Sequence, residues 1–260
     1  MSETKILIAA HKPYSFPTDG LYMPVQVGAV GKDKFLTCSD DTGDNISEKN
    51  PYYCELTALY FAWKNITADA VGLVHYRRYF KGGFKFSVGD RKIGVLSGKE
   101  CEDLLRETDV ILPKKRKYYI ETLYSHYANT MYVEPLDIAG EIIKEQYGDY
   151  YAEFLRLKKR SSAHMFNMAI MKKPVFDGYC GWLFPILSEL EKRVDYKKYD
   201  TFHARFFGRV SELLLDVYIN TNKIKYAEVK VVSTEKIRWV KKILGFLGAK
   251  FFKKKYDKSF

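Results

Sequence analysis

The sequence predicts an α/β protein with a mostly parallel central sheet flanked by helices. The apolar run at residues 5–10 is typical of a strand buried on both faces. The order strand, loop, strand, loop, helix, strand over residues 5–74 is typical of α/β winding. With 260 residues, 47% of them hydrophobic, the chain can build one large core without disulfides. We expect one domain at residues 1–232 and a tail at 233–260.

The first half of the chain supplies this pattern. The strand at 5–10 ends at His11 and Lys12, and six prolines and glycines between residues 13 and 34 predict a surface loop. A brief strand at 34–38, a polar loop at 39–47, a helix over 51–65 and a strand over 69–74 follow. Within the helix, Leu56, Leu59 and Trp63 recur at helical spacing.

The second half alternates further helices and strands. Residues 84–98 are rich in glycine and weakly patterned, which predicts an excursion from the core. Periodicity then predicts helices at 100–107, 136–147, 150–157, 176–194 and 205–220, with strands at 109–112, 165–171 and within 223–232. Pro185 should bend or restart the fourth of these helices.

Several classes of protein are excluded because the sequence lacks their motifs. It has four widely spaced cysteines with no C-x-x-C pair, which indicates reduced thiols in a cytosolic protein. It shows no signal-peptide pattern and no apolar run of about twenty residues, so we expect no membrane span. It has neither a P-loop nor a G-x-G-x-x-G motif after a strand, so neither a P-loop ATPase nor a Rossmann dehydrogenase is supported.

The net charge of +11 favours partners that carry phosphate. Much of the excess lies in the tail, where lysines alternate with apolar residues such as Trp239 and Phe246 at roughly helical spacing. This pattern predicts a basic amphipathic helix on an anionic membrane surface. The alternative is a terminal helix that docks on its own domain.

The segment at residues 71–80 runs from a buried strand directly into charge. Val71 to Val74 are followed by His75, Tyr76, Arg77 and Arg78 with no turn-forming residue between them. Ligands bind at the carboxyl ends of strands in open α/β sheets, and guanidinium groups suit phosphate oxygens. The segment therefore predicts a phosphate site, unless these side chains merely leave the core for water.

Three further polar features are candidates for chemistry. Glu55 lies in an otherwise apolar helix and Asn167 in an apolar strand, so each needs partners if it is buried. Glu212 shares a helical face with Arg209, which predicts either an ion pair or a general base. The loop with Asp40, Asp41, Asp44 and Asn45 is either an ordinary turn or a contact for a cation, nucleotide or sugar.

Long and unusual motifs cover nearly everything before the tail. They are DDTGDNIS at 40–47, Asn50, YCELTALY at 53–60, WKN at 63–65, HYRRYF at 75–80, FNM at 166–168, Tyr179, WLF at 182–184, Arg205, Gly208 and Glu212. In these motifs the chain strongly resembles a family of capsular and exopolysaccharide glycosyltransferases catalogued as a domain of unknown function, number 4422. The motifs are more specific to the family than to a substrate.

The resemblance implies a GT-A-like nucleotide-sugar transferase, with relatives that use UDP-galactofuranose or UDP-galactose. It places the end of the first strand and Asp40 or Asp41 against the nucleoside, and residues 166–168 along the donor sugar. We therefore expect nucleotide and diphosphate contacts from Ala9, Ala10, His11, Asp40, Asn45, His75, Tyr76, Arg77, Arg78 and Arg205, and sugar contacts from Phe166, Asn167 and Met168.

This chain departs from the GT-A pattern at one position that matters. GT-A enzymes generally carry an Asp-x-Asp metal motif at the end of the strand where this chain has His75 to Arg78. We therefore expect no Mn²⁺ or Mg²⁺ ligands there, and expect the cations to neutralise the leaving diphosphate instead. For an inverting reaction, the candidate bases are Glu212, then Glu55, then Asp41.

The expected function follows from the resemblance and the tail together. It is the transfer of a hexose, with galactofuranose or galactose favoured, from a UDP-sugar to a lipid-linked saccharide acceptor in capsule, exopolysaccharide or O-antigen synthesis. We expect a cytoplasmic enzyme, peripheral on the inner face of the cell membrane, with no nucleic acid as partner. The alternative is a nucleic-acid-binding module that uses the basic and aromatic residues 114–132 and the tail.

Overall fold

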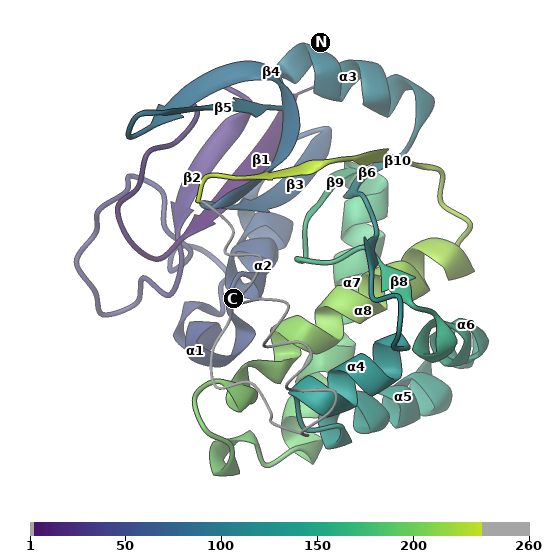
Figure 1. Cartoon of the computed structure of the whole chain (residues 1–260). Coiled ribbons are helices and arrows are strands. Elements are labelled where there is room, and N and C mark those ends of the chain that lie inside the picture. Colours follow the sequence, from purple (N-terminus) through teal and green to yellow (C-terminus); the bar gives the residue numbers. More distant parts are fainter. Residues whose placement is uncertain (1–2, 236–260) are drawn as a thin grey trace.

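The structure, a computed structural model, describes residues 3–235, so the predicted amphipathic helix of the tail lies outside the described residues (Figure 1). The main sheet has nine strands within the described residues, and six of them lie side by side in the order β10–β6–β9–β3–β1–β2. They are β1 (Thr4–Ala10), β2 (Tyr22–Gln26), β3 (Ala70–His75), β6 (Val110–Pro113), β9 (Ala169–Lys172) and β10 (Tyr226–Val229). Only β9 runs against the others, which confirms the mostly parallel sheet.

Helices flank this sheet as predicted. They are α1 (Asn50–Tyr53), α2 (Leu56–Asn65), α3 (Gly98–Glu107), α4 (Leu123–Thr130), α5 (Glu134–Gln146), α6 (Gly148–Lys159), α7 (Lys173–Arg193) and α8 (Phe206–Thr221). In Figure 1, α3 lies above the sheet and α4 to α8 lie mostly below it. A small separate sheet joins β7 (Arg116–Lys117) to β8 (Ser162–Ala163).

The alternation of side chains along β1 divides the core in two. Leu7 and Ala9 pack into the larger cluster, which is built with α2 and α5 to α8. Ile6, Ile8 and Ala10 pack into the smaller cluster on the other face, with α3 and a hairpin. The hairpin consists of β4 (Arg78–Val88) and β5 (Arg91–Val95), and β11 (Val231–Ser233) pairs with β4. Burial on both faces explains the continuous apolar run at the start of the chain.

Three predictions about the first half of the chain needed correction. The loop predicted at 13–34 contains β2, which tolerates Pro24 because β2 lies at the edge of the sheet. Residues 34–38 form no strand; only Ser39 makes a bridge to Gln26. The helix predicted at 51–65 is interrupted at Cys54, whose φ of 54° separates α1 from α2.

Four predictions further along also needed correction. The glycine-rich excursion at 84–98 is largely the β4–β5 hairpin, and the strand predicted at 165–171 begins only at Ala169. The strand predicted within 223–232 is two short strands, β10 and β11. Pro185 lies inside α7, which continues without a restart.

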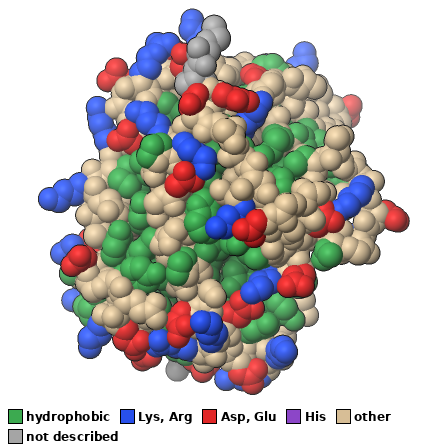
Figure 2. Space-filling view, turned by 180° about the vertical axis from the view of Figure 1, so that it is seen from behind, with side chains coloured by type: hydrophobic (Ala, Val, Ile, Leu, Met, Phe, Trp, Pro, Cys, Tyr) green, Lys and Arg blue, Asp and Glu red, His purple; other side chains and the backbone are tan. Residues whose placement is uncertain are grey.

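The face of the molecule turned away in Figure 1 shows acidic and basic side chains interspersed over most of its surface (Figure 2). The excess of positive charge is therefore not gathered into one uniform patch on that face. No helix among residues 3–235 is long and apolar enough to span a membrane.

Candidate active site

The candidate site begins where β3 ends. His75 is the last residue of β3, Tyr76 and Arg77 make a tight turn, and Arg78 pairs with His75 as the first residue of β4. The absence of a turn-forming residue did not prevent this turn, so the charged residues lie on a hairpin and not on one continuous strand. The hairpin sends His75 and Arg78 to neighbouring positions at the carboxyl end of the parallel strands, where ligands bind in open α/β sheets.

A second turn, at Phe166 and Asn167 just before β9, faces this hairpin. Both residues have positive φ, 82° and 51°, although neither is glycine. The backbone carbonyl of Phe166 lies 2.6 Å from Nε2 of His75, and the Arg78 guanidinium lies over the Phe166 ring at 4.9 Å. Because a carbonyl can only accept, Nε2 of His75 carries the proton. Consecutive non-glycine residues at positive φ are uncommon and often mark functional sites.

Asn167 ties three parts of the fold together. Its amide donates to Oε1 of Glu55 at 2.7 Å and to the carbonyl of Gly208, on α8, at 3.0 Å. The side chain is buried, and its Oδ1 has no hydrogen-bond partner among the described residues. The turn thus orients Glu55 and leaves a buried acceptor oxygen beside it.

Glu212 and Arg209 complete this cluster from α8. Glu212 is only 6% exposed, and its Oε2 lies 3.5 Å from Nη1 of Arg209. Both carboxylates, Glu55 and Glu212, interact electrostatically with Arg78, Arg209 and His75. The structure therefore brings together five charged or titratable side chains from four elements.

The two carboxylates differ in their protonation equilibria. Burial raises the pKa of Glu212, and the Glu55 charge adds to this, while Arg209 only partly opposes it. Burial also raises the pKa of Glu55. The interaction with His75, the hydrogen bond from Asn167 and the charge of Arg209 lower it by more, so the pKa of Glu55 lies below its ordinary value. Carboxyl groups whose environments separate their pKa values are typical of acid–base chemistry.

A cationic group lies beside this cluster, around His11 at the end of β1. Burial lowers the pKa of His11, and the positive charges of Arg77, Lys12, Arg205 and Lys32 lower it further. The charges of four cationic side chains from four separate segments therefore act on one imidazole. Such a site favours a ligand with multiple negative charges.

Tyr76 and Arg77 have partners within the chain. The Tyr76 ring is buried and makes edge contacts with His11 at 5.1 Å and Tyr14 at 5.0 Å. Arg77 lies over the Tyr76 ring at 5.0 Å and pairs with Glu235 at 3.2 Å, with 41% of its side chain exposed. Tyr76 therefore supports the cationic group, and Arg77 contributes charge at its rim.

The acidic loop serves the fold. Asp40 is fully buried and accepts from the backbone amides of Gly28 and Ala29 and from the hydroxyls of Ser47 and Thr57. Both oxygens of Asp40 thus accept hydrogen bonds within the fold, and they order the loop that carries Lys32.

The two other predicted residues of this loop also have partners within the chain. The pKa of Asp41 is lowered by hydrogen bonds from Lys34 and Ser39. Asn45 closes a turn through Gly43 and Ser47. The described contacts of Asp41 and Asn45 thus lie within their own loop and do not include the carboxylate cluster.

The remaining predicted residues are spread over different environments. Ala9, Ala10 and Met168 are buried in the core, so only their backbones can face a ligand. Arg205 is exposed at the start of α8, where its Nε lies 2.9 Å from Sγ of Cys54. Burial raises the pKa of the Cys54 thiol to about 11, which keeps it protonated at neutral pH.

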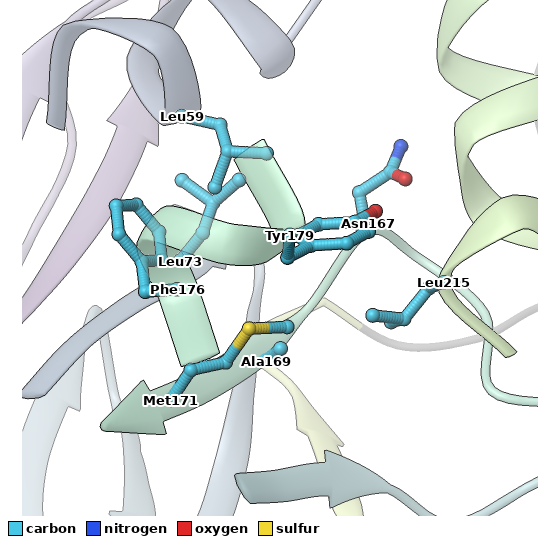
Figure 3. A pocket seen from close by; sticks show the side chains of 8 residues that line it. All are labelled: Leu59, Leu73, Asn167, Ala169, Met171, Phe176, Tyr179 and Leu215. Atoms are coloured by element: carbon cyan, nitrogen blue, oxygen red, sulfur yellow. The ribbon is translucent and has the colours of Figure 1, made fainter. Parts of the chain in front are cut away.

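An apolar cavity lies behind Asn167 (Figure 3). It is lined by Leu59, Leu73, Ala169, Met171, Phe176, Tyr179 and Leu215, with the Asn167 amide at its edge. It admits about 10 Å³ of water-sized volume, which is room for about one water molecule. The cavity is therefore part of the core and not the space for a sugar.

The turn between β3 and β4 offers no carboxylate of its own to a divalent metal. Its side chains include Arg77 and Arg78, and the Nε2–H of His75 is already bonded to the Phe166 carbonyl. The two carboxylates of the cluster, Glu55 and Glu212, interact instead with Arg78, Arg209 and His75. Hard divalent cations require oxygen ligands, above all carboxylates. Within residues 3–235, no group of three or more His, Cys, Asp or Glu side chains is placed to hold a metal ion.

Besides Arg209, which the sequence analysis considered only as the ion-pair partner of Glu212, three cations of the site were not among the residues predicted for it. Lys12 follows the first strand directly, so its position at a strand end was a usable signal. Lys32 lies in a loop that is held by hydrogen bonds to Asp40 and Ser47, which are distant in sequence. Arg116 lies in the separate β7–β8 sheet, and its charge lowers the pKa of Glu212. No local sequence pattern predicts that these two residues interact.

The chain is similar to proteins that are already known. Residues 5–223 match the model of a family described as a domain of unknown function, DUF4422. Among solved structures, the chain is similar to the apo structure of the WbbM bifunctional glycosyltransferase, with 30% identity and a TM-score of 0.81. The match covers 90% of this chain but 46% of that protein, so this chain spans less than half its length. No curated protein matches the chain.

Proposed function

We propose that this chain, which belongs to the DUF4422 family, is a glycosyltransferase that transfers a hexose from a UDP-sugar to a saccharide acceptor. We favour galactofuranose or galactose as the sugar and a lipid-linked acceptor in surface polysaccharide synthesis. The observation that carries the proposal is the adjacency of a cationic group and a carboxylate pair at the carboxyl end of β1 and β3. The similar solved structure, a glycosyltransferase by its title, supports it.

The cationic group suits a leaving nucleoside diphosphate. Bond cleavage at the anomeric carbon leaves its electron pair on an oxygen of the β-phosphate, so negative charge grows there in the transition state. The charges of Lys12, Lys32, Arg77 and Arg205 act on His11, and Arg78 lies one residue beyond the turn. Cations that are already in place stabilise this charge without reorganisation at the moment of reaction.

The carboxylate pair suits the acceptor side of the reaction. Glu212 takes the proton of the attacking hydroxyl as its oxygen bonds to the anomeric carbon. Burial raises the pKa of Glu212, which brings this base closer to neutral pH and makes it more effective. Glu55, held by Asn167, serves as the counter-charge for His75 and Arg209.

The sugar lies, in this proposal, against the turn at Phe166 and Asn167. The buried Oδ1 of Asn167 has no partner within the described residues and can accept from a sugar hydroxyl. A membrane contact through the predicted helix of the tail is also part of the proposal, although that segment lies outside the described residues. The lipid-linked acceptor and the membrane contact of the tail together imply a location on the inner face of the cell membrane.

The test is incubation of the full chain with UDP-galactose, UDP-galactofuranose and UDP-glucose. Saturable release of UDP from at least one donor is expected, and silence with all three would refute the donor assignment. The reaction should also persist in EDTA, because the turn between β3 and β4 offers no carboxylate of its own to a metal. Activity abolished by EDTA and restored by Mn²⁺ would show that the arginines are not the main counter-charge.

A further inference from the structure

Two segments that are far apart in sequence form one surface beside the site. They are residues 114–120, around β7, and residues 155–160, at the end of α6. Their connection is the β7–β8 sheet, in which Lys117 pairs with Ser162. The amide of Tyr118 donates to the Ser161 carbonyl at 2.8 Å, and that of Leu123 donates to the Arg160 carbonyl at 2.7 Å. We call residues 114–120 and 155–160 together the basic surface.

The basic surface is strongly cationic. Its two segments contain eight Lys and Arg residues and no Asp or Glu. Nearby carboxylates neutralise only part of this charge: Glu153 pairs with Arg156 and Arg160, and Asp137 pairs with Lys158. Glu121, next in the chain, is buried and hydrogen-bonded to His126 and Asn129. The surface therefore keeps a net positive charge.

The same surface exposes large apolar side chains. Tyr119 is 85% exposed, Ile120 is 52% exposed and Leu155 is 41% exposed. These are three of the five large hydrophobic side chains that are exposed within residues 3–235. Exposed apolar groups among cations are costly to keep in water and mark an interaction site when they gather.

The chemistry of the exposed residues identifies the partner. Single-stranded nucleic acid would use cations and aromatic rings, but Ile120 and Leu155 have no ring on which a base can stack. An anionic bilayer binds both the cationic and the apolar side chains. Lysines and arginines contact the headgroups, while aromatic and aliphatic side chains enter the interface. We propose that the basic surface binds anionic lipid bilayers, independently of the tail.

This contact would set the orientation of the site. Arg116 belongs to the basic surface, lies over the Tyr118 ring at 5.1 Å and acts electrostatically on Glu212. A bilayer on this surface therefore lies on the Glu212 side of the site, from which we expect the acceptor to enter. Lipid binding itself does not depend on the proposed transferase activity, so the two can fail separately.

The experiment is co-sedimentation of the full chain with phosphatidylcholine vesicles, with and without phosphatidylglycerol. One variant, Tyr119→Ser/Ile120→Ser, removes two exposed apolar side chains. Another, Lys117→Glu/Lys159→Glu, reverses two charges. We expect the partition coefficient on anionic vesicles to fall by about tenfold or more for the charge variant. For the apolar variant we expect a fall of several-fold.

Matched controls lie elsewhere on the surface. Lys92→Glu/Lys99→Glu changes the net charge by the same amount at exposed positions, and Val30→Ser removes another exposed apolar side chain. The controls should bind as wild type does, and circular dichroism should show all variants folded.

Two results would overturn the proposal. The first is vesicle binding that is unchanged in the test variants or equally reduced in the controls. The second is loss of binding to a single-stranded oligonucleotide in the test variants while vesicle binding persists, which would assign the surface to nucleic acid.

Discussion

Replacement of Glu212 by glutamine tests the assignment of the base. Glutamine keeps the size of the side chain and its capacity to accept a hydrogen bond, but it cannot take a proton from the acceptor. Because Glu212 is 6% exposed, bulk water has little access to replace it. We expect the rate of transfer to fall while the binding of UDP, which the cationic group provides, stays close to that of wild type.

The size of the effect follows from the role. General base catalysis contributes about 100-fold to 10,000-fold in rate. At about 1.4 kcal/mol for each factor of ten, this is about 3–5 kcal/mol of transition-state stabilisation. A purely structural ion pair with Arg209, which is 40% exposed, would contribute little to the rate and about 1 kcal/mol or less to stability.

The assay combines the rate of UDP release with its pH dependence and with thermal melting as a control of folding. A base must be ionised, so the rate falls as pH falls through its pKa. Burial raises the pKa of Glu212 above the ordinary 4.5, and the acid limb of kcat/KM should therefore lie above pH 4.5 in wild type. If Glu55 is the base, that limb should lie below pH 4.5, because its pKa is lowered.

Two outcomes would refute the assignment. One is a folded Glu212→Gln variant with a transfer rate within a few-fold of wild type. The other is an acid limb below pH 4.5 that disappears in Glu55→Gln, which would transfer the role to Glu55.

Three further predictions concern the ligand site and its support. Arg78→Met should weaken UDP binding by about tenfold or more in calorimetry, because it removes a charge-assisted contact. The control Arg106→Met, on exposed α3, should leave the affinity unchanged. Equal affinities of the two variants for UDP would contradict a role of Arg78 in binding the diphosphate. Lys32→Ala should weaken UDP binding by a few-fold at low salt and less at high salt, and an effect that does not depend on salt would contradict a charge contribution. Asp40→Ala should lower the free energy of unfolding by about 3 kcal/mol or more in urea, because four donors lose their acceptor; unchanged stability would show that they find other partners.

The sequence predicted the fold class because burial on both faces leaves a continuous apolar run, as in β1 and β3. It failed where tertiary contacts overrule local composition. β2 contains Pro24 and follows a loop of prolines and glycines, yet its pairing with β1 stabilises it at the sheet edge. The hairpin of β4 and β5 was hidden for a similar reason, because its glycines make close backbone approaches, such as Gly82 beside Leu96.

The candidate site was partly predictable. A polar residue in an apolar setting must have a partner, and this reasoning selected Glu55 and Asn167, which the structure joins at 2.7 Å. It could not give the roles of the aspartates, because a carboxylate that caps backbone amides and one that meets a ligand look alike in sequence. Asp40 proved to be the former, and the loop that it orders supplies Lys32.

The most direct test of the account is a crystal structure of the full chain with UDP. We expect diphosphate oxygens within hydrogen-bond distance of Arg78 or of the cations around His11, with Glu212 facing the open side of the β-phosphate. A diphosphate bound elsewhere, or held by a metal ion on carboxylates that this account assigns to the fold, would contradict it.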